Sequence, residues 1–259
     1  MLRFSANLGF LWAEMELTNA ILAAASAGFD AVECHWPFDV PPARMIETLH
    51  DAGLPMLGLN TRRGNVEAGD FGLAAVVGRE SEVRGFIDEA VGYAASINAT
   101  AVHVMAGRTD RGAASEVCYR ENLAYAAELA APHGITILIE PINQRDVAGY
   151  HLSYVEDAVA TIEALQSDNV KMMFDCYHVQ IMQGDLIHRL CKHLDYIGHV
   201  QIAAVPDRGE PNAGELDYRS ILMALDAAGY EGFIGAEYRP RTTTIDGLGW
   251  LEAAKSWQA

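Results

Sequence analysis

Basic residues are scarce in this sequence, and their scarcity excludes one class of partner. Among 259 residues there are 18 Lys and Arg but 35 Asp and Glu, so the formal net charge is −17 at pH 7. A nucleic-acid-binding protein needs a basic face that displaces counterions from the phosphates. We therefore expect no nucleic-acid partner. The acidity itself indicates solubility more than function.

Cysteines and long apolar segments are also scarce. No CxxC pair is present, and a disulfide framework is not expected in so long a chain. The four cysteines are Cys34, Cys118, Cys176 and Cys191. No run of 18 apolar residues could cross a membrane, and the N-terminal segment lacks the long apolar stretch of a signal peptide. These absences predict a cytoplasmic protein that does not contact a membrane.

The sequence has no Pro-, Gly- or Ser-rich linker and no low-complexity tract that would divide it. Its length of 259 residues is close to the roughly 250 residues typical of one (β/α)₈ domain. An open, doubly wound sheet would usually carry a Gly-rich phosphate turn after its first strand. The corresponding segment here is ANLGFLW, which has no GxGxxG pattern. We predict a single domain over residues 1–259.

Short apolar segments alternate eight times with segments of helical spacing. The predicted strands are 3–8, 31–36, 55–60, 100–107, 136–141, 171–175, 198–202 and 232–238. The predicted helices are 16–27, 42–52, 81–97, 114–131, 154–166, 179–194, 218–228 and 245–256. This alternation predicts parallel strands joined by right-handed crossovers, and we expect them to close into a (β/α)₈ TIM barrel. The long polar segment 61–80 is predicted to be a lid or binding loop.

The last four predicted strands each carry an oxygen-bearing side chain near the C-terminal end. These residues are Glu140, Asp175, Gln201 and Glu237, at separations of 35, 26 and 36 residues. Each separation suits one βα unit, so the four side chains would meet at the end of the barrel where active sites lie. Their neighbours Ile139, Phe174, Val200 and Ala236 are apolar and suit the opposite, helix-facing side of each strand.

Three carboxylates converging in a barrel mouth would repel one another, and a divalent cation would relieve the repulsion. Ligation by oxygen alone suits a hard ion, so we expect one Mg²⁺ or Mn²⁺. A zinc site would more often present His or Cys.

Seven segments resemble the hydroxypyruvate isomerase family, which belongs to the xylose isomerase-like barrels. They are MLRFSANL (1–8), GRESEVR (78–84), IEPIN (139–143), FDCYH (174–178), GHVQIA (198–203), RGEPNAGEL (208–216) and GAEYRP (235–240). The resemblance covers essentially the whole chain and implies a xylose isomerase-like TIM barrel that uses one divalent ion.

By this resemblance, Glu140, Asp175, Gln201 and Glu237 carry over as metal ligands. Glu140 and Glu237 also carry over as the catalytic acid/base pair. The implied activity is isomerisation of a small oxo-acid, either hydroxypyruvate to 2-hydroxy-3-oxopropanoate or a 2-oxo-tetronate. Such a reaction moves a proton between adjacent carbons through an enediolate, and one group must remove the proton while another returns it.

Three further residues are candidates for substrate binding. His178 follows Asp175 by three residues on the same predicted turn and could hydrogen-bond a substrate hydroxyl. Arg208 lies in the loop after the seventh strand and could grip a carboxylate in a bidentate manner. Asp146 lies six residues past Glu140 and could orient a substrate oxygen or cap the next helix.

One departure from the family pattern keeps the substrate open. Where related isomerases often have NLPAG, this sequence has NTRRG (60–64). Arg62 and Arg63 could contact a larger or more acidic substrate, or face solvent or a neighbouring subunit.

Alternatives to the isomerase remain open from the sequence. They are a ketose 3-epimerase of the same barrel family, a metal-dependent phosphodiesterase of the endonuclease IV type, and a non-catalytic protein that binds sugar acids. A phosphodiesterase would need a His-rich zinc site and a basic groove, and neither is evident. The expected partner is a small-molecule oxo-acid or sugar acid, and a homo-oligomer stays open.

Overall fold

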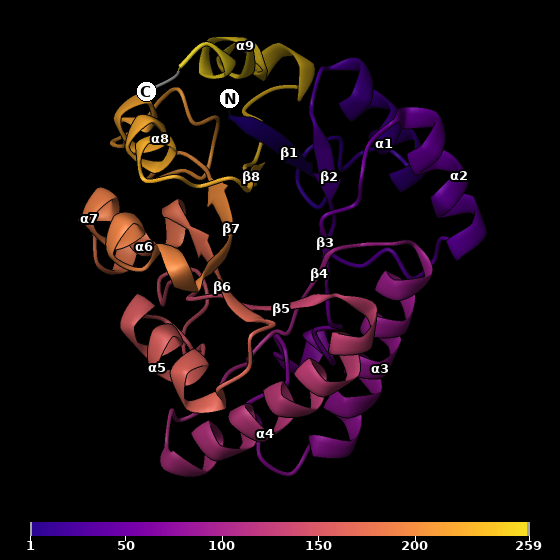
Figure 1. Ribbon diagram of the computed structural model, residues 1–259, viewed down its shortest axis with the longest axis vertical. Helices are drawn as coiled ribbons and strands as arrows, with labels where there is room; N and C mark the ends of the chain where they lie inside the picture. Colours follow the sequence, from indigo (N-terminus) through magenta and orange to yellow (C-terminus); the bar gives the residue numbers. More distant parts are fainter. Residues whose placement is uncertain (1, 258–259) are drawn as a thin grey trace.

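The computed structural model describes residues 2–257 and contains a barrel of parallel strands inside a ring of helices (Figure 1). The strands are β1 (Arg3–Asn7), β2 (Ala31–Glu33), β3 (Gly58–Asn60), β4 (Ala101–His103), β5 (Thr136–Ile139), β6 (Val170–Asp175), β7 (Ile197–Ile202) and β8 (Phe233–Ala236). The helices are α1 (Leu17–Ser26), α2 (Pro42–Ala52), α3 (Glu80–Ser96), α4 (Ala113–Ala130), α5 (Val155–Leu165), α6 (Cys176–Met182), α7 (Leu186–Lys192), α8 (Tyr218–Ala227) and α9 (Gly249–Lys255). Short 3₁₀ turns are η1 (Val66–Ala68), η2 (Ala131–His133), η3 (Leu194–Tyr196) and η4 (Ile245–Gly247).

The eight strands pair in parallel in the order β2-β1-β8-β7-β6-β5-β4-β3. The seam between β2 and β3 is joined by backbone hydrogen bonds, including Leu57 N to Val32 O at 2.8 Å and Cys34 N to Gly58 O at 3.1 Å. The sheet is therefore almost closed, and the predicted (β/α)₈ barrel is confirmed.

Several strands are shorter than the sequence predicts. Near their C-terminal ends, backbone amides donate to side-chain oxygens instead of to the backbone of the neighbouring strand. β4 ends at His103 rather than at residue 107. Beyond it, the Met105 amide donates to the hydroxyl of Thr61 at 3.1 Å, and the Ala106 amide donates to the hydroxyl of Tyr150 at 3.0 Å. The strand ends thus become the floor of a site rather than further sheet.

The predicted helix over 179–194 is two helices in the structure. The break between α6 and α7 falls at Gly184 and Asp185, whose φ angles are 65° and 53°. A left-handed backbone cannot continue a right-handed helix. α6 also begins earlier than predicted, because the Asp175 carboxylate accepts a hydrogen bond of 2.9 Å from the Tyr177 amide and caps the helix.

Segment 61–80 is a packed loop rather than a free flap. Leu73, Ala74 and Ala75 are buried, and Gly72 sits so close to the segment that follows β4 that an added Cβ would lie 2.5 Å from the Met105 carbonyl oxygen. The segment therefore covers one side of the barrel mouth in a fixed position.

The apolar core has two parts. The large part lies between the strands and the helices, whereas a small separate cluster of Ala101, Leu138 and Met173 fills the barrel interior. Two positions after each of them, near the end of the same strand, stands a polar residue: His103, Glu140 and Asp175 respectively. Because side chains alternate along a strand, those polar residues also point into the barrel.

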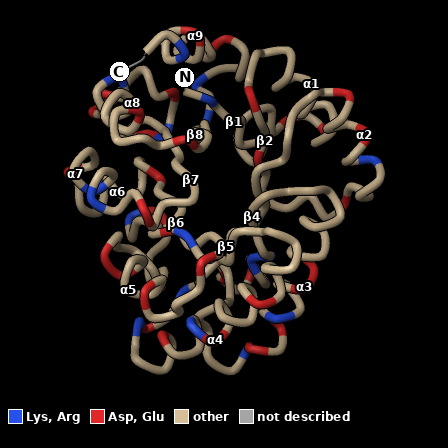
Figure 2. The backbone as a smooth tube through the Cα atoms, viewed as in Figure 1, with Lys and Arg blue, Asp and Glu red and all other residues tan. Residues whose placement is uncertain are grey.

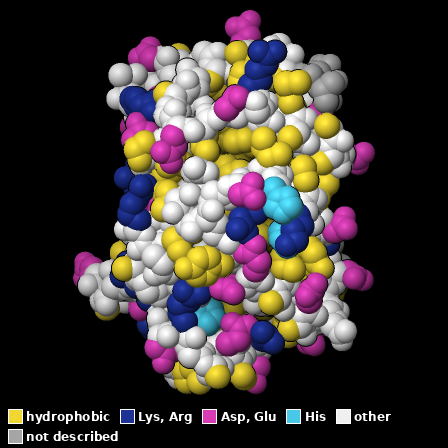
Figure 3. Space-filling view, turned by 90° about the vertical axis from the view of Figure 1, so that its left-hand side faces the viewer, with side chains coloured by type: hydrophobic (Ala, Val, Ile, Leu, Met, Phe, Trp, Pro, Cys, Tyr) yellow, Lys and Arg dark blue, Asp and Glu magenta, His cyan; other side chains and the backbone are white. Residues whose placement is uncertain are grey.

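The outer surface is polar and mixed in charge. Acidic and basic residues are spread around the whole ring (Figure 2), and on the face that carries α7 and α8 both signs alternate with apolar patches (Figure 3). Between residues 2 and 257, no helix is long and apolar enough to span a bilayer.

Candidate active site

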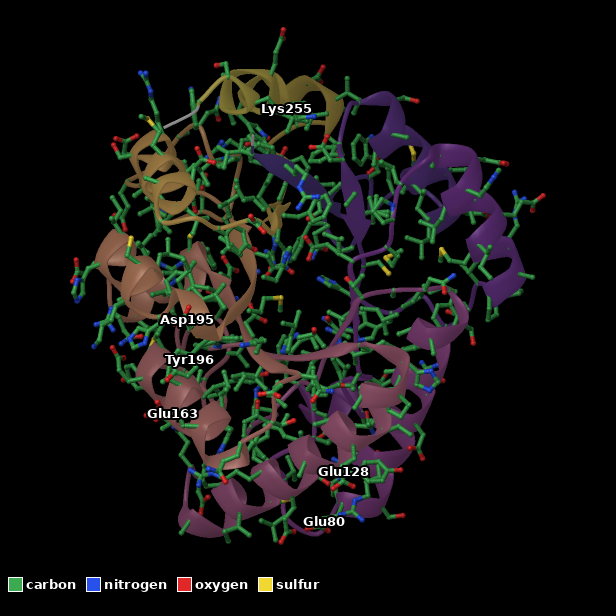
Figure 4. All side chains as sticks on the ribbon, viewed as in Figure 1. Glu80, Glu128, Glu163, Asp195, Tyr196 and Lys255 are labelled. Carbon is green, nitrogen blue, oxygen red and sulfur yellow. The ribbon has the colours of Figure 1, made fainter. Side chains whose placement is uncertain are left out.

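The candidate site lies at the C-terminal ends of β5 to β8. In contrast, the labelled side chains of Figure 4 lie on the outer ring, where the Tyr196 hydroxyl donates to Glu163 at 2.6 Å. The four residues predicted as metal ligands, Glu140, Asp175, Gln201 and Glu237, are all at most 6% exposed.

Glu140, Asp175 and His178 form a cluster that could hold a metal ion, with one ligand atom from each residue within 4.8 Å of the others. The imidazole Nε2 of His178 lies 3.6 Å from Glu140 Oε1 and 3.6 Å from Asp175 Oδ2. The cluster thus joins two predicted ligands with a residue that the sequence assigned to substrate binding.

The hydrogen bonds of His178 identify its tautomer. The backbone amide of Asn143 donates to His178 Nδ1 at 3.4 Å, and the Asn143 side-chain amide lies 2.6 Å from the same atom. Burial and then the charge of Arg208 lower the pKa of His178 well below its usual value, which favours the neutral ring. Since Nδ1 accepts, Nε2 carries the proton and acts as a donor toward the carboxylates or a bound ligand.

Glu237 is held from several sides. Its Oε1 accepts from the Asn7 side-chain amide at 3.0 Å and lies 3.1 Å from His35 Nε2. Arg208 Nη2 donates to Glu237 Oε2 and to Asp175 Oδ2, the latter at 3.2 Å. Glu237 and Asp175 are therefore bridged by one guanidinium.

The position of Arg208 is fixed by its backbone and by two aromatic rings. Its φ angle is 56°, and its carbonyl accepts from the Arg239 amide at 2.7 Å. The guanidinium carbon lies 4.9 Å from the ring centres of both Phe10 and Tyr177. A non-glycine residue in a left-handed conformation is uncommon and often marks a functional position.

The buried carboxyl groups differ in acidity. Burial raises the pKa of Glu140 well above its usual value, and the charges of Glu237 and Asp175 add to this. Burial likewise raises the pKa of Asp175 to about 7, although Arg208 opposes the rise. For Glu237, burial is outweighed by Arg208 and His35, which lower its pKa to about 2.

Gln201 takes part in a hydrogen-bond network inside the barrel. Its Nε2 donates to Glu33 Oε2 at 2.9 Å. Glu33 also lies 3.1 Å from His199 Nε2 and accepts from the Ser5 hydroxyl at 3.0 Å. Because the amide nitrogen is directed to Glu33, the carbonyl oxygen of Gln201 is left for another partner.

Two buried acceptors, Glu140 Oε1 and Gln201 Oε1, have no hydrogen-bond partner among residues 2–257. Unpaired buried oxygens are costly. A hard cation that accepts several oxygen ligands would satisfy both, so the side chains present fit a divalent ion of this kind.

Two connected pockets lead from solvent to these groups. The inner pocket, about 70 Å³, is lined by Glu140, Glu237 and His178. The outer pocket, about 530 Å³, is lined by Asp146, Tyr177 and other residues. Asp146 thus lies at the mouth rather than beside the ligand cluster, and its Oδ2 accepts from the Tyr177 hydroxyl at 2.7 Å.

Sequence reasoning gave too little weight to the residues from β1 to β4. Asn7, Glu33 and His35 lie near the C-terminal ends of the first two predicted strands, and they hold Glu237 and Gln201 in place. His103, the last residue of β4, is buried. Neither of its ring nitrogens has a partner in the described chain, and its Nδ1 lies 3.7 Å from Glu140 Oε2. The sequence signal that could have identified these four residues is their position near the C-terminal ends of strands.

Comparisons with known proteins match the chain along its length. A family described as the xylose isomerase-like TIM barrel matches residues 21–254. The 2-oxo-tetronate isomerase of Cupriavidus necator is 44% identical over 97% of this chain and 98% of its own. The hydroxypyruvate isomerase of Escherichia coli is 37% identical over 97% of this chain and 99% of its own. A crystal structure named as AP endonuclease, family 2, from Brucella melitensis has a TM-score of 0.94 and 40% identity, covering 98% of this chain and 99% of that one.

Proposed function

Since the chain belongs to the xylose isomerase-like TIM barrel family, we propose that it is a metal-dependent isomerase of a small 2-oxo-acid. The observation that carries the proposal is the buried pair of carboxyls Glu140 and Asp175 at the C-terminal end of the barrel, near a Gln201 oxygen that accepts no hydrogen bond in the described chain. Two relatives that match over their whole lengths are named 2-oxo-tetronate isomerase and hydroxypyruvate isomerase. These two substrates are therefore the ones to test first.

We propose that Glu140, Asp175, Gln201 and Glu237 hold one Mg²⁺ or Mn²⁺. One buried oxygen each of Glu140 and Gln201 accepts no hydrogen bond in the described chain, which supports this set. When bound, the ion would supply positive charge for the oxygens that become negative during the reaction. Glu237 now shares Arg208 with Asp175, so we expect this salt bridge to rearrange when the ion binds.

Glu140 and Glu237 are proposed as the acid/base pair that moves the proton between adjacent carbons through an enediolate. They come from β5 and β8, and both line the inner pocket. His178, with its proton on Nε2, is proposed to donate to a substrate oxygen. Arg208 is proposed to contact the substrate through Nε, which is buried and without a partner in the described chain. Asp146 would act at the pocket mouth.

An endonuclease activity has little support, although one similar structure is named after it. The net charge is −17, and charges of both signs are mixed over the ring (Figure 2). Phosphate binding to duplex DNA needs a concentrated basic surface. We also propose a cytoplasmic location, since Cys34, Cys118 and Cys176 are buried free thiols and such cysteines suit a reducing compartment.

The decisive experiment follows the carbon-bound proton by NMR in D₂O with Mg²⁺, using hydroxypyruvate and a 2-oxo-tetronate. The wild-type protein should isomerise at least one of them and exchange the transferred proton. Glu140→Gln and Glu237→Gln should each lower kcat by about 10²–10⁴, which is the usual contribution of a positioned acid or base.

A matched control is Glu128→Gln, because Glu128 lies on the outer ring on α4 (Figure 4) and its variant should match wild type. Metal content is measured for every variant, because both glutamates are also proposed ligands. Normal exchange in both variants with normal metal content would refute the two-glutamate mechanism. Inversion at a single carbon without isomerisation would identify a ketose 3-epimerase, and binding without exchange would identify a binding protein.

A further inference from the structure

Besides Arg208, the outer pocket is lined by Arg63 and Arg239. The Arg63 guanidinium carbon lies 4.1 Å from the ring centre of Trp36 and 5.9 Å from that of Phe71. No side chain between residues 2 and 257 accepts a hydrogen bond from it or pairs with it. The residue is half-buried. Burial lowers the pKa of Arg63, so the surroundings disfavour a charge that a bound anion would stabilise.

The neighbouring arginine has a different environment. Arg62 makes a bidentate pair with Glu89 of α3, with nitrogen–oxygen distances of 2.6 and 2.9 Å. It faces away from the pocket, which it does not line. Of two adjacent arginines in one loop, one is therefore neutralised and the other is directed into the pocket.

The acids around the outer pocket are already engaged. Asp207 pairs with Arg241 at 2.8 Å, and Asp146 accepts from Tyr177. Arg208 is shared between two buried carboxylates, so its charge is compensated before any substrate arrives. Arg63 and Arg239 are then the arginines of this pocket without an acidic partner in the described chain, and Arg63 is half-buried whereas Arg239 is exposed. We therefore take Arg63 as the cation that gains most from a bound anion.

Trp36 makes the position of Arg63 well defined. The indole Nε1 donates to the Thr61 carbonyl oxygen at 3.1 Å, which fixes the ring. A guanidinium stacked on a fixed aromatic ring keeps its edge free for the two oxygens of a carboxylate.

The outer pocket adjoins the inner one. The two share Phe10, His35, Trp36, Phe71, Val147 and Arg208. A small ligand could thus contact Arg63 at one end and lie beside the glutamates at the other.

We propose that Arg63 is the carboxylate-binding subsite of this pocket, so that a short 2-oxo-monocarboxylate binds with its carboxylate outward and its reacting carbons inward. This inference rests on the proposed function. The sequence predicted that Arg208 binds the substrate carboxylate. We now propose that Arg63, in the loop 61–80, has this role. Arg208 would then contact an oxygen near the reacting carbons.

The test compares an acid with a neutral molecule of nearly the same shape. Hydroxypyruvate and dihydroxyacetone differ by a carboxylate in place of a hydroxymethyl group. In Arg63→Gln the ratio of kcat/KM for hydroxypyruvate to that for dihydroxyacetone should fall about 10- to 100-fold, the usual effect of losing a charged hydrogen bond. Arg63→Lys should recover part of the ratio. Arg62→Gln, the matched control, should leave it within about twofold of wild type.

A binding measurement separates this subsite from the catalytic proposal. Glycerate, which carries no oxo group, is titrated into the Mg²⁺-loaded protein in a calorimeter, with glycerol as the neutral counterpart. Wild type should bind glycerate more tightly than glycerol, and Arg63→Gln should remove the difference. The wild-type preference should also weaken as salt is added, because the subsite opens to solvent.

The outcomes are distinct. If wild type isomerises hydroxypyruvate and Arg63→Gln keeps the wild-type ratio, the subsite is refuted while the function stands. An equal effect of Arg62→Gln would also refute it. If no oxo-acid is isomerised but glycerate binding still depends on Arg63, the subsite is supported and the proposed isomerase activity is wrong.

Discussion

At the residue scale, the buried carboxyl groups couple proton binding to metal binding. Burial raises the pKa values of Glu140 and Asp175, the latter to about 7. Below that pH the metal-free carboxyls hold protons that a cation must displace, because only the ionised forms are ligands. The affinity for a divalent ion should therefore fall as the pH is lowered.

Calorimetry can test this coupling. At about pH 6, the heat of Mg²⁺ or Mn²⁺ binding should depend on the ionisation enthalpy of the buffer, which reports proton release. At about pH 8 the contribution of Asp175 should have disappeared. Asp175→Asn should bind the ion more weakly and release fewer protons at about pH 6. A heat of binding independent of the buffer at pH 6 would contradict the assignment of these carboxyls as ligands.

At the scale of elements, β8 passes close to the hydrogen-bonded side chains of Glu33 and Gln201, and at Gly235 there is no room for a side chain. A Cβ at Gly235 would lie 2.2 Å from Glu33 Oε1 and 2.9 Å from Gln201 Cγ. Gly235→Ala would force Glu33 and Gln201 to move. We expect it to destabilise the fold by about 1–3 kcal/mol, as overpacking does, and to weaken metal binding because the Gln201 oxygen is displaced.

Gly92→Ala is the matched control. Gly92 is exposed on α3, and nothing lies within 4 Å of its added Cβ. Alanine in a helix interior is favoured over glycine by roughly 0.5–1 kcal/mol. Urea unfolding should therefore show a lower free energy of unfolding for Gly235→Ala and a higher one for Gly92→Ala, each compared with wild type. A neutral or stabilising Gly235→Ala would show that the network is not tightly packed.

At the scale of the whole molecule, the proposed ligands connect four consecutive strands, so a bound ion should stabilise the barrel. A ligand at 100 times its Kd stabilises the folded state by about 2.7 kcal/mol. For a domain of this size, that corresponds to an increase in Tm on the order of 5–10 °C.

Thermal unfolding with excess Mn²⁺ and after chelation should reveal this difference. Asp175→Asn should lose most of it, whereas Glu128→Gln on the outer ring should retain it. Equal Tm values for wild type in both conditions would argue against a bound structural or catalytic ion at the strand ends.

The sequence alone determined the barrel, the family and the strand ends that carry the oxygens. Alternating strand and helix periods are local properties, so eight βα units can be recognised without contacts. The placing of Glu140, Asp175, Gln201 and Glu237 near strand ends follows from the same local pattern. The resemblance to the hydroxypyruvate isomerase family is confirmed by full-length relatives, whereas the roles of these residues stay predictions.

Only the tertiary structure decided which partner each side chain meets. Gln201 turns its amide to Glu33, which lies 168 positions away in sequence. Arg62 and Arg63 are adjacent and chemically identical, yet one pairs with Glu89 and the other stacks on Trp36. The physical reason is that hydrogen bonds and ion pairs act over a few ångströms in space, and closing the barrel is what brings distant strands to that distance.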